Sequence, residues 1–484
     1  MLFNSIDFAI FLPIVFLLYW FVTNKSLKLQ NLLVVVASYV FYGWWDWRFL
    51  SLIVFSTVVD YIVGLKLVQE NGLVKRKVWL WLSIVINLGL LGFFKYYNFF
   101  LDNFITAFSF FGTEIHPNSL NIILPVGISF YTFQTLSYSI DVYKRKLAPT
   151  KDFIAFSAFV SFFPQLVAGP IERASNLLPQ FYKKRTFDYN KAVDGMRQIL
   201  WGLFKKIVIA DNCAKYANII FNNSDEYNGS TLVLGALFFT FQIYGDFSGY
   251  SDIAIGTARL FGFNLKQNFA FPYFSRDIAE FWRRWHISLS TWFRDYLYIP
   301  LGGSRGSTWR KVRNIFIIFM VSGFWHGANW TFIIWGALNA LYFLPLLLLK
   351  RNRKHINNIA KEKYFPNLKE LFQMLVTFGL TVIAWVFFRA ENIRHAWGYL
   401  SEIFSVSLFE MPSIKQGISS SFFIIVFVIF FIFIEWMSRA NLHTLERLEL
   451  RMRRPLRWIF YILLMILIFL YSGSEAKNFI YFQF

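Results

Sequence analysis

The sequence predicts an all-α protein that crosses a membrane many times, and three observations support this. Hydrophobic residues make up 56% of the 484 residues, and charged residues only 16%, against about 25% charged residues in soluble domains. Long, nearly uncharged apolar segments recur along the whole chain. Basic residues gather in the short stretches between these segments, which is typical of a membrane topology.

The apolar segments predict about eleven to twelve crossings, because a helix needs ~20 residues to cross a bilayer. The segment 314–349 is long enough for a hairpin of two helices. The predicted spans lie near residues 7–23, 31–45, 47–64, 79–97, 121–143, 193–210, 230–250, 314–349, 369–389, 420–437 and 457–472.

The basic clusters predict the orientation of the chain. Lys25 and Lys28 lie between the first two spans, and every later cluster falls on the same side as this loop. Since basic loops face the cytoplasm, both termini are expected outside it. The net charge of +20 is then a consequence of topology, and we expect no nucleic-acid partner.

Several classes of site are excluded by composition. Cys213 is the single cysteine, so no internal disulfide, cysteine-based zinc cluster or redox pair is possible, and we expect no metal. The first apolar segment follows Met1 without a basic region or a cleavage site, which predicts a retained span rather than a signal peptide. Without repeats or low-complexity tracts, residues 1–484 are predicted to form one integral membrane domain, with its core motifs in 121–349.

Two segments depart from the alternation of spans and loops. Residues 152–170 are apolar but have basic loops at both ends, so they should re-enter the membrane or lie in its interface. Pro164, Gly169 and Pro170 would break a straight helix there. In the basic stretch 259–313, a helix on the membrane surface is predicted by one apolar face, formed by Trp282, Trp285, Leu289, Trp292 and Tyr296.

The first candidate site is WHGAN, Trp325 to Asn329. His326 follows Arg313 by thirteen residues, so a continuous helix would carry it roughly 20 Å into the apolar layer. A lone buried histidine is most simply a hydrogen-bonding partner between helices. The flanking Gly323 and Gly327, with Asn329 and a second histidine elsewhere, favour a functional role for His326 and substrate contacts for Trp325 and Asn329.

The second candidate is FWRRWHISLSTWFRDY. His286, Ser290 and Arg294 are spaced by four residues, so one helix would carry them on the face opposite the tryptophans. Glu280 and Arg284 have the same spacing and are predicted to pair. Arginines at this surface could hold a phosphorylated ligand, or could simply anchor the helix at the membrane; the candidates are Arg283, Arg284 and Arg294.

The third candidate is QIYGDFSGYSD, where Asp246 and Asp252 enclose Tyr250 at the end of an apolar span. Carboxylates at such depth need partners. They could orient a histidine or pair with an arginine, and a purely structural ion pair is as well supported as a catalytic role. GGSRG at 302–306 matches the nucleophile-elbow pattern, but that motif requires a preceding strand, which is not expected here.

Two histidines without a convincing nucleophile point to general base catalysis, in which a neutral imidazole takes the proton of an attacking hydroxyl. The competing interpretation is a transporter whose buried His, Asp and Arg residues relay protons. Many transporters contain inverted repeats, and their absence here favours an enzyme.

The motifs ILPVGISFYTFQTLSYSIDVY, FPQLVAGPIER, YGDFSGYSDIAIG, EFWRRWHISLSTWFRDYLYIPLGG and GFWHGANWTFIIWG occur in this order. On these motifs, which cover nearly the whole chain, the sequence resembles the membrane-bound O-acyltransferase superfamily. Within it, the chain is most similar to the bacterial membrane proteins that O-acetylate alginate, peptidoglycan and other surface polysaccharides. The membrane protein of teichoic acid D-alanylation is a more distant relative.

The resemblance implies a ring of tilted helices with a funnel from each face, meeting at the catalytic His326 with His286 as the second histidine. It implies a cytoplasmic thioester donor, acetyl-CoA or an acyl carrier, with no bound cofactor. It also implies a secreted or periplasmic SGNH-type acetyltransferase as partner, a polysaccharide acceptor and contact with membrane lipid. A flippase of an acyl or glycan carrier, and a scaffold whose partner does the chemistry, are the alternatives.

Overall fold

The computed structural model describes residues 1–110, 120, 122–361, 363–413, 418–473 and 479–480. Within these ranges the regular elements are all helices and no strand is present, which confirms the all-α fold class. The chain divides into two compact units, described separately below. Unit 1 holds residues 1–192 and 257–265, and unit 2 holds residues 193–256 and 266–484. That the whole chain forms one domain stays a prediction.

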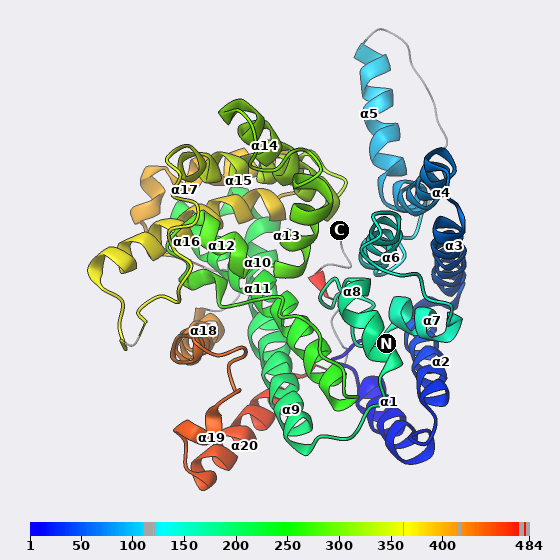
Figure 1. Ribbon diagram of the computed structural model, residues 1–484. Helices are drawn as coiled ribbons and strands as arrows, with labels where there is room; N and C mark the ends of the chain where they lie inside the picture. Colours follow the sequence, from blue (N-terminus) through cyan, green and yellow to red (C-terminus); the bar gives the residue numbers. More distant parts are fainter. Residues whose placement is uncertain (111–119, 121, 362, 414–417, 474–478, 481–484) are drawn as a thin grey trace. The chain divides into compact units, whose positions relative to one another are not determined.

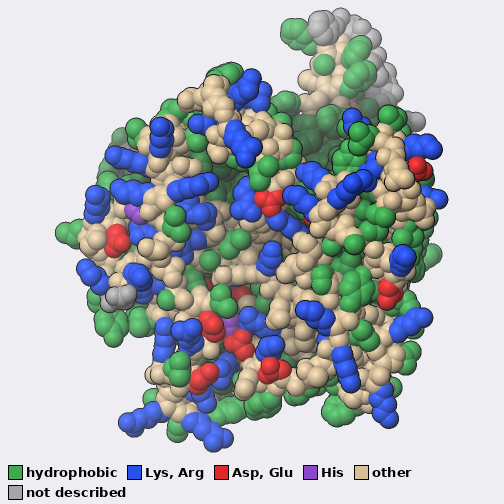
Figure 2. Space-filling model, viewed as in Figure 1, with side chains coloured by type: hydrophobic (Ala, Val, Ile, Leu, Met, Phe, Trp, Pro, Cys, Tyr) green, Lys and Arg blue, Asp and Glu red, His purple; other side chains and the backbone are tan. Residues whose placement is uncertain are grey.

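The multi-pass membrane character is confirmed by helix length and composition. Six helical stretches among the described residues are long and apolar enough to cross a membrane: Leu27–Gln69, Leu73–Phe110, Gly229–Leu260, Trp330–Leu348, Leu368–Arg389 and Arg454–Tyr471. Ile6–Val22 and Phe422–Ser438 are shorter apolar helices. The first of the six is 43 residues long and contains two predicted spans. On the face drawn in Figure 2, apolar side chains share the surface with many Lys and Arg side chains and few acidic ones.

Unit 1 is built from the first eight helices, some of which pack side by side in Figure 1. Helix α3 packs against both α4 and α6, and α2 packs against α7. Their bounds are α1 Ile6–Leu17, α2 Leu27–Asp46, α3 Leu50–Gln69, α4 Leu73–Leu91, α5 Tyr97–Phe110, α6 Ile128–Tyr143, α7 Phe153–Ser161 and α8 Ala174–Leu177.

A buried carboxylate joins three helices of unit 1. Asp60 of α3 is fully buried. It accepts hydrogen bonds from Ser83 Oγ at 2.5 Å and Asn87 Nδ2 at 2.8 Å, both on α4, and from Ser139 Oγ of α6 at 2.7 Å. Because polar groups buried away from water need partners, this network fixes the register of α3, α4 and α6.

The predicted break in residues 152–170 is confirmed. Helix α7 ends at Ser161, before Pro164, and is only nine residues long, too short to cross a bilayer. The chain from Phe162 to Pro170 is non-helical and buried within the unit, so its irregular backbone is covered by protein.

Unit 2 contains the remaining helices, except that α9 (Tyr189–Leu203) begins in unit 1 and α11 ends in unit 1. Helices α14 and α15 form the predicted hairpin, and α15 also packs against α16, as Figure 1 shows. The bounds are α10 Asp211–Asn222, α11 Gly229–Leu260, α12 Ile278–Arg284, α13 Ile287–Phe293, α14 Thr308–His326, α15 Trp330–Leu348, α16 Leu368–Arg389, α17 Ile393–Ile403, α18 Ile418–Ser438, α19 Leu448–Arg451 and α20 Arg454–Tyr471.

The two helices of the α14–α15 hairpin approach each other closely because glycines lie at their interface. A Cβ at Gly323 of α14 would overlap the carbonyl group of Phe332 on α15, and a Cβ at Gly336 of α15 would overlap the carbonyl group of Phe319. Glycine thus allows the backbones to meet. This approach positions the end of α14, where His326 lies.

The prediction of one surface helix around His286 is wrong. Helix α12 ends at Arg284, His286 adopts the left-handed region with φ of 43°, and α13 begins at Ile287. The backbone groups released by the break bond to a neighbouring segment, with Ile287 N–H donating to Asn268 O and Ala270 N–H to Arg284 O, both at 2.9 Å.

The apolar face of that region is also covered by protein rather than presented to the membrane surface. Trp285, Leu289 and Trp292 are all buried. Trp285 packs against the rings of Phe281 and Trp385. The apolar residues spaced by three and four therefore mark the buried sides of two successive short helices. Hydrophobic periodicity alone does not show that the helix breaks between them.

Candidate active site

His326 is the last residue of α14 and is buried, with 3% of its surface exposed. Three aromatic rings from three helices surround its imidazole. The ring centroids of Trp325 on α14, Trp335 on α15 and Phe388 on α16 lie 4.9, 5.2 and 5.3 Å away, all edge-on. Such T-shaped contacts fix ring orientation, so the hairpin and α16 together hold His326 in one pose.

His286 is held by a polar partner that lies eighteen residues earlier in the chain. Its Nδ1 lies 3.1 Å from Asn268 Oδ1. The same Asn268 oxygen accepts the backbone N–H of Ser288 at 3.3 Å and the Ser288 hydroxyl at 2.9 Å. Because a backbone N–H can only donate, the Asn268 atom is the carbonyl oxygen, and His286 Nδ1 must carry the proton. The lone pair of His286 is therefore on Nε2.

The surroundings of His286 keep it neutral. The side chain is buried beside the ring of Phe247, whose centroid is 4.7 Å away in a T-shaped contact. Burial lowers the pKa of His286 to about 3, since desolvation disfavours the charged form. At neutral pH the imidazole is thus in the form that can act as a base.

The two candidate histidines meet at a single indole. The ring centroid of Trp325 lies 6.0 Å from that of His286 and 4.9 Å from that of His326. The structure therefore brings together His286, Trp325 and His326, which the sequence analysis selected from two separate motifs. Their catalytic and binding roles stay predictions.

The two aspartates of α11 pair with lysines. Asp246 Oδ1 lies 2.5 Å from Lys206 Nζ, and its Oδ2 accepts the backbone N–H of Ile480 at 2.8 Å. Asp252 Oδ2 lies 2.5 Å from Lys205 Nζ. Asp252 Oδ1 also accepts a hydrogen bond from Gln198 Nε2 at 2.8 Å. These contacts join the two carboxylates of α11 to lysines, an amide and the backbone rather than to a histidine.

Tyr250, between the two aspartates, is buried. Its ring packs edge-on against Phe479 at 4.4 Å, and the ammonium group of Lys206 lies 4.4 Å from the same phenyl centroid. This part of α11 is therefore tied to the segment at 479–480 by both aromatic and charged contacts.

The pairing of Glu280 with Arg284 is confirmed at 2.9 Å, and Arg276 joins it at 3.0 Å. Burial opposes ionisation of Glu280, but the hydrogen bonds and charges of the two arginines outweigh it and lower the pKa of the carboxyl. Arg283 is exposed and donates to the carbonyl groups of Asn352 and His355 at 2.8 and 2.7 Å. Of these arginines, Arg284 is thus committed to a buried ion pair.

Three other predicted residues make local contacts. Ser290 Oγ donates to Trp285 O at 3.4 Å, and the exposed Arg294 pairs with Asp295 at 2.7 Å. Asn329 caps α15 by accepting the N–H of Thr331 at 3.0 Å, and it donates to Glu391 O at 2.8 Å. The amide of Asn329 is thus occupied in holding the turn after His326 rather than the imidazole itself.

Sequence reasoning missed Asn268, Lys205 and Lys206. The lysines carried a signal, because two adjacent cations in the apolar segment 193–210 require buried acidic partners. They lie in a wider helical turn, Phe204–Ala210, between α9 and α10. Asn268 carried no signal, since one asparagine in a polar loop is unremarkable until the fold places it beside His286.

The model of the membrane-bound O-acyltransferase family matches residues 144–387, which is half of the chain and includes both histidines. The chain belongs to the membrane-bound O-acyltransferase family. A Pseudomonas aeruginosa protein named "Probable alginate O-acetylase AlgI" is 42% identical over 421 residues, covering 86% of this chain and 77% of the relative.

Two further relatives have other named activities. The Helicobacter pylori peptidoglycan O-acetyltransferase is 39% identical, covering 82% of this chain and 78% of the relative. The Bacillus subtilis teichoic acid D-alanyltransferase is 27% identical, covering 58% of this chain and 72% of the relative. This membrane-bound O-acyltransferase is therefore an enzyme of the bacterial O-acetylation subfamily. Within the part of the chain that the structure describes, no cluster of His, Cys, Asp and Glu could hold a metal ion.

Proposed function

We propose that this enzyme takes an acetyl group from a cytoplasmic thioester, acetyl-CoA or an acyl carrier, and passes it across the bacterial inner membrane for O-acetylation of an extracytoplasmic polysaccharide. The observation that carries the proposal is the meeting of two buried histidines at Trp325, one of them with its lone pair directed by Asn268 to Nε2. Relatives named for alginate and peptidoglycan acetylation support the choice of acceptor class.

In the proposed reaction His326 is the general base. Its imidazole takes the proton of an acceptor hydroxyl while the hydroxyl oxygen bonds to the thioester carbon. The carbon–sulfur bond breaks, and the thiolate leaves with the proton that His326 returns. The aromatic rings around His326 exclude water, so the thioester is not lost to hydrolysis.

His286 serves as a second base in this scheme. Its Nδ1–H is held by Asn268, so Nε2 can accept a proton and pass it on. The proposal assigns no covalent acyl-enzyme to either histidine, and trapping an acyl-histidine would contradict that assignment. Arg283 and Arg294 are exposed and are proposed to contact the phosphates of the donor. Arg284 is instead proposed to support this region through its ion pair with Glu280.

The orientation follows from the charge pattern. Basic loops are proposed to face the cytoplasm, which places both termini outside it and the donor on the basic side. A secreted or periplasmic SGNH-type acetyltransferase is proposed to receive the acetyl group and place it on the polysaccharide.

Purified protein in sealed proteoliposomes, supplied on one side with acetyl-CoA labelled in the acetyl group, tests the proposal. Release of free CoA that depends on an acceptor supports acyl transfer. Movement of intact labelled donor without thioester cleavage would instead support a flippase. Release of no CoA even with the SGNH-type partner present would contradict the enzyme proposal.

A further inference from the structure

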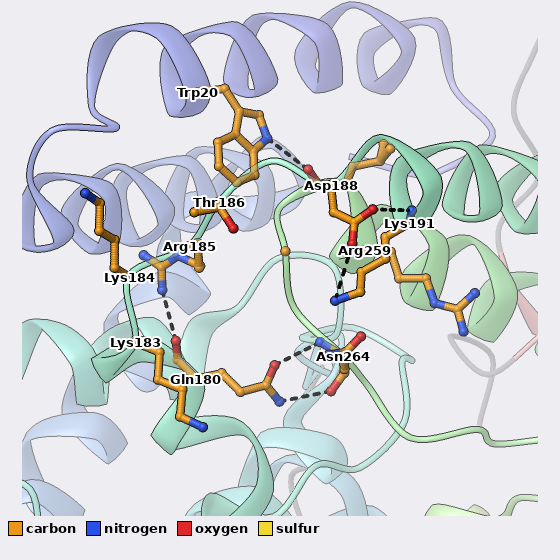
Figure 3. A pocket seen from close by; sticks show the side chains of 12 residues that line it. Trp20, Gln180, Lys183, Lys184, Arg185, Thr186, Asp188, Lys191, Arg259 and Asn264 are labelled. Carbon is orange, nitrogen blue, oxygen red and sulfur yellow. Dashed lines mark hydrogen bonds and ion pairs between the residues drawn. The ribbon is translucent and has the colours of Figure 1, made fainter.

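A basic pocket of about 290 Å³ lies within unit 1, away from the candidate active-site residues in sequence. Figure 3 shows it from close by. Five cationic side chains and one carboxylate line it: Lys183, Lys184, Arg185, Lys191, Arg259 and Asp188. Asp188 is already engaged, because its Oδ1 accepts the N–H of Lys191 at 3.1 Å and its Oδ2 lies 3.8 Å from Lys191 Nζ. The pocket therefore has a large excess of positive charge.

Arg185 is the buried charge of this pocket, with 7% of its surface exposed. It donates hydrogen bonds to three neutral oxygens, Gln180 O at 3.2 Å, Asn31 Oδ1 at 2.7 Å and Gln30 Oε1 at 3.4 Å. Its guanidinium also lies 4.8, 5.6 and 6.0 Å from the ring centroids of Phe263, Tyr19 and Phe181, but none of these partners is an anion. Among the described residues its Nε has no hydrogen-bond partner. Burial lowers the pKa of the guanidinium, and a buried cation without a counter-ion is costly. An anion from outside the chain would stabilise it.

Lys183 and Lys184 supply the exposed part of the positive charge. Among the residues drawn in Figure 3, no dashed line joins either ammonium group to a carboxylate. The ammonium groups of Lys183 and Lys184 can therefore bind an anion in the pocket without breaking an ion pair to a residue that lines it. Gln180 and Asn264 hold the pocket floor, with Gln180 Nε2 donating to Asn264 O and Asn264 N–H donating to Gln180 Oε1, at 3.0 and 2.9 Å.

An apolar groove of about 510 Å³ adjoins the basic pocket. The groove and the pocket share Trp20, Lys184, Arg185 and Thr186. The groove is walled by Phe16, Phe21 and Phe187, and Phe21 is 73% exposed and Phe187 49% exposed. A phosphate-sized cationic site thus continues directly into an exposed apolar channel.

We propose that this combined surface binds one anionic phospholipid. The phosphodiester lies in the pocket against Lys183, Lys184 and the buried Arg185, and an acyl chain follows the groove past Phe21 and Phe187. The continuity with the groove is what assigns the anion to a lipid rather than to a soluble phosphate, which would gain nothing from the aromatic wall. Trp20 lines both the pocket and the groove, and its indole N–H donates to Leu260 O at 2.9 Å.

Native mass spectrometry of the full-length protein in detergent tests this proposal. The probes are dioleoyl-phosphatidylglycerol, dioleoyl-phosphatidylcholine with the same tails but no net charge, and glycerol 3-phosphate with no tails. The test variant is the double substitution K183Q/K184Q, which leaves the buried Arg185 in place. The matched control is K75Q/K77Q, which removes the same charge from two exposed lysines near the start of α4.

We expect one phosphatidylglycerol to bind in preference to phosphatidylcholine. K183Q/K184Q should weaken the binding of phosphatidylglycerol roughly tenfold to thirtyfold, because each lysine near an anionic headgroup adds about fivefold to the affinity. K75Q/K77Q should bind the lipid like the wild type. Equal loss in both variants, or no loss in either, would overturn the site. Displacement of the lipid by millimolar glycerol 3-phosphate would overturn the lipid assignment and leave a soluble phosphate as occupant.

Discussion

Asn268 Oδ1 lies 3.1 Å from His286 Nδ1 and also accepts the backbone N–H of Ser288. One amide oxygen therefore decides which nitrogen of a buried histidine carries the proton. The protonation pattern of His286 thus depends on a residue eighteen positions earlier in the chain.

Replacing Asn268 by aspartate tests this dependence. The carboxylate would stabilise the imidazolium and raise the pKa of His286, so the neutral base would form only at higher pH. Since a neighbouring carboxylate raises that pKa from about 3 by ~1–3 units, we expect acetyl transfer in N268D to match the wild type at pH 7. It should fall as the pH drops below about 6, where the wild type keeps its rate. S288A removes only one hydroxyl donor to the same oxygen and should change the rate little. A flat pH–rate profile in N268D would contradict the assigned role.

The low pKa of His286 also predicts a pH-dependent stability. The pKa is about 3 in the folded protein against an ordinary value of 6.5, so below pH 6.5 the unfolded chain binds a proton that the folded chain excludes. The free energy of unfolding should therefore fall as the pH falls from 6.5 towards 3, by about 2 kcal/mol at pH 5.

Thermal unfolding of the wild type and H286N between pH 5 and 7.5 measures this effect. Asparagine tolerates the left-handed backbone at position 286 and does not titrate. The difference in stability between wild type and variant should shrink at pH 5. A difference that is constant with pH would show that His286 is not the group responsible.

The sequence predicts those structural features that depend on residues close together in the chain, and misses those that depend on tertiary contacts. The α14–α15 hairpin follows from apolar length and glycine spacing, and the structure has it. The depth of His326 in the membrane stays a prediction. The break before His286 was missed, because Trp285, Leu289 and Trp292 keep helical spacing across it. The break is stabilised by two tertiary hydrogen bonds, in which Ile287 N–H donates to Asn268 O and Ala270 N–H donates to Arg284 O. Such contacts cannot be predicted from local spacing.

The charged partners illustrate the same limit. Glu280 and Arg284 pair within one helical turn, so spacing alone predicted them. Asp246 and Lys206 are forty residues apart and meet only in the folded unit. Sequence showed that Asp246 needs a partner but not which one.

The Asp60 network predicts a stability effect far from the candidate site. D60L would leave the donors of Ser83, Asn87 and Ser139 buried without their acceptor, at a cost of roughly 1–3 kcal/mol for each unsatisfied group. We expect D60L to unfold at a clearly lower temperature, and D60N, which keeps one acceptor oxygen, to lie between it and the wild type. Unfolding of D60L at the wild-type temperature would show that the network adds no stability.

Lys206 is predicted to be more important for stability than other lysines. Its ammonium group lies 2.5 Å from Asp246 and 2.9 Å from Asp211, so K206M leaves two carboxylates without their cation. A loss of about 3–5 kcal/mol is expected, measured as lower yield of folded protein and a lower unfolding temperature. K191M, at an exposed lysine, is the control and should behave as wild type. Equal unfolding temperatures of K206M and K191M would show that the ion pairs of Lys206 do not stabilise the fold.

The role of His326 as base is tested most directly by H326A, measured in two ways on equal amounts of folded protein. Thioester cleavage is followed in purified protein with labelled acetyl-CoA, and surface ester content is followed in cells. We expect both activities to be lost in H326A while the fold survives. Cleavage that persists while surface ester is lost would restrict His326 to onward transfer and give thioester opening to His286. If neither activity changes, His326 is a structural histidine and the proposed mechanism is wrong.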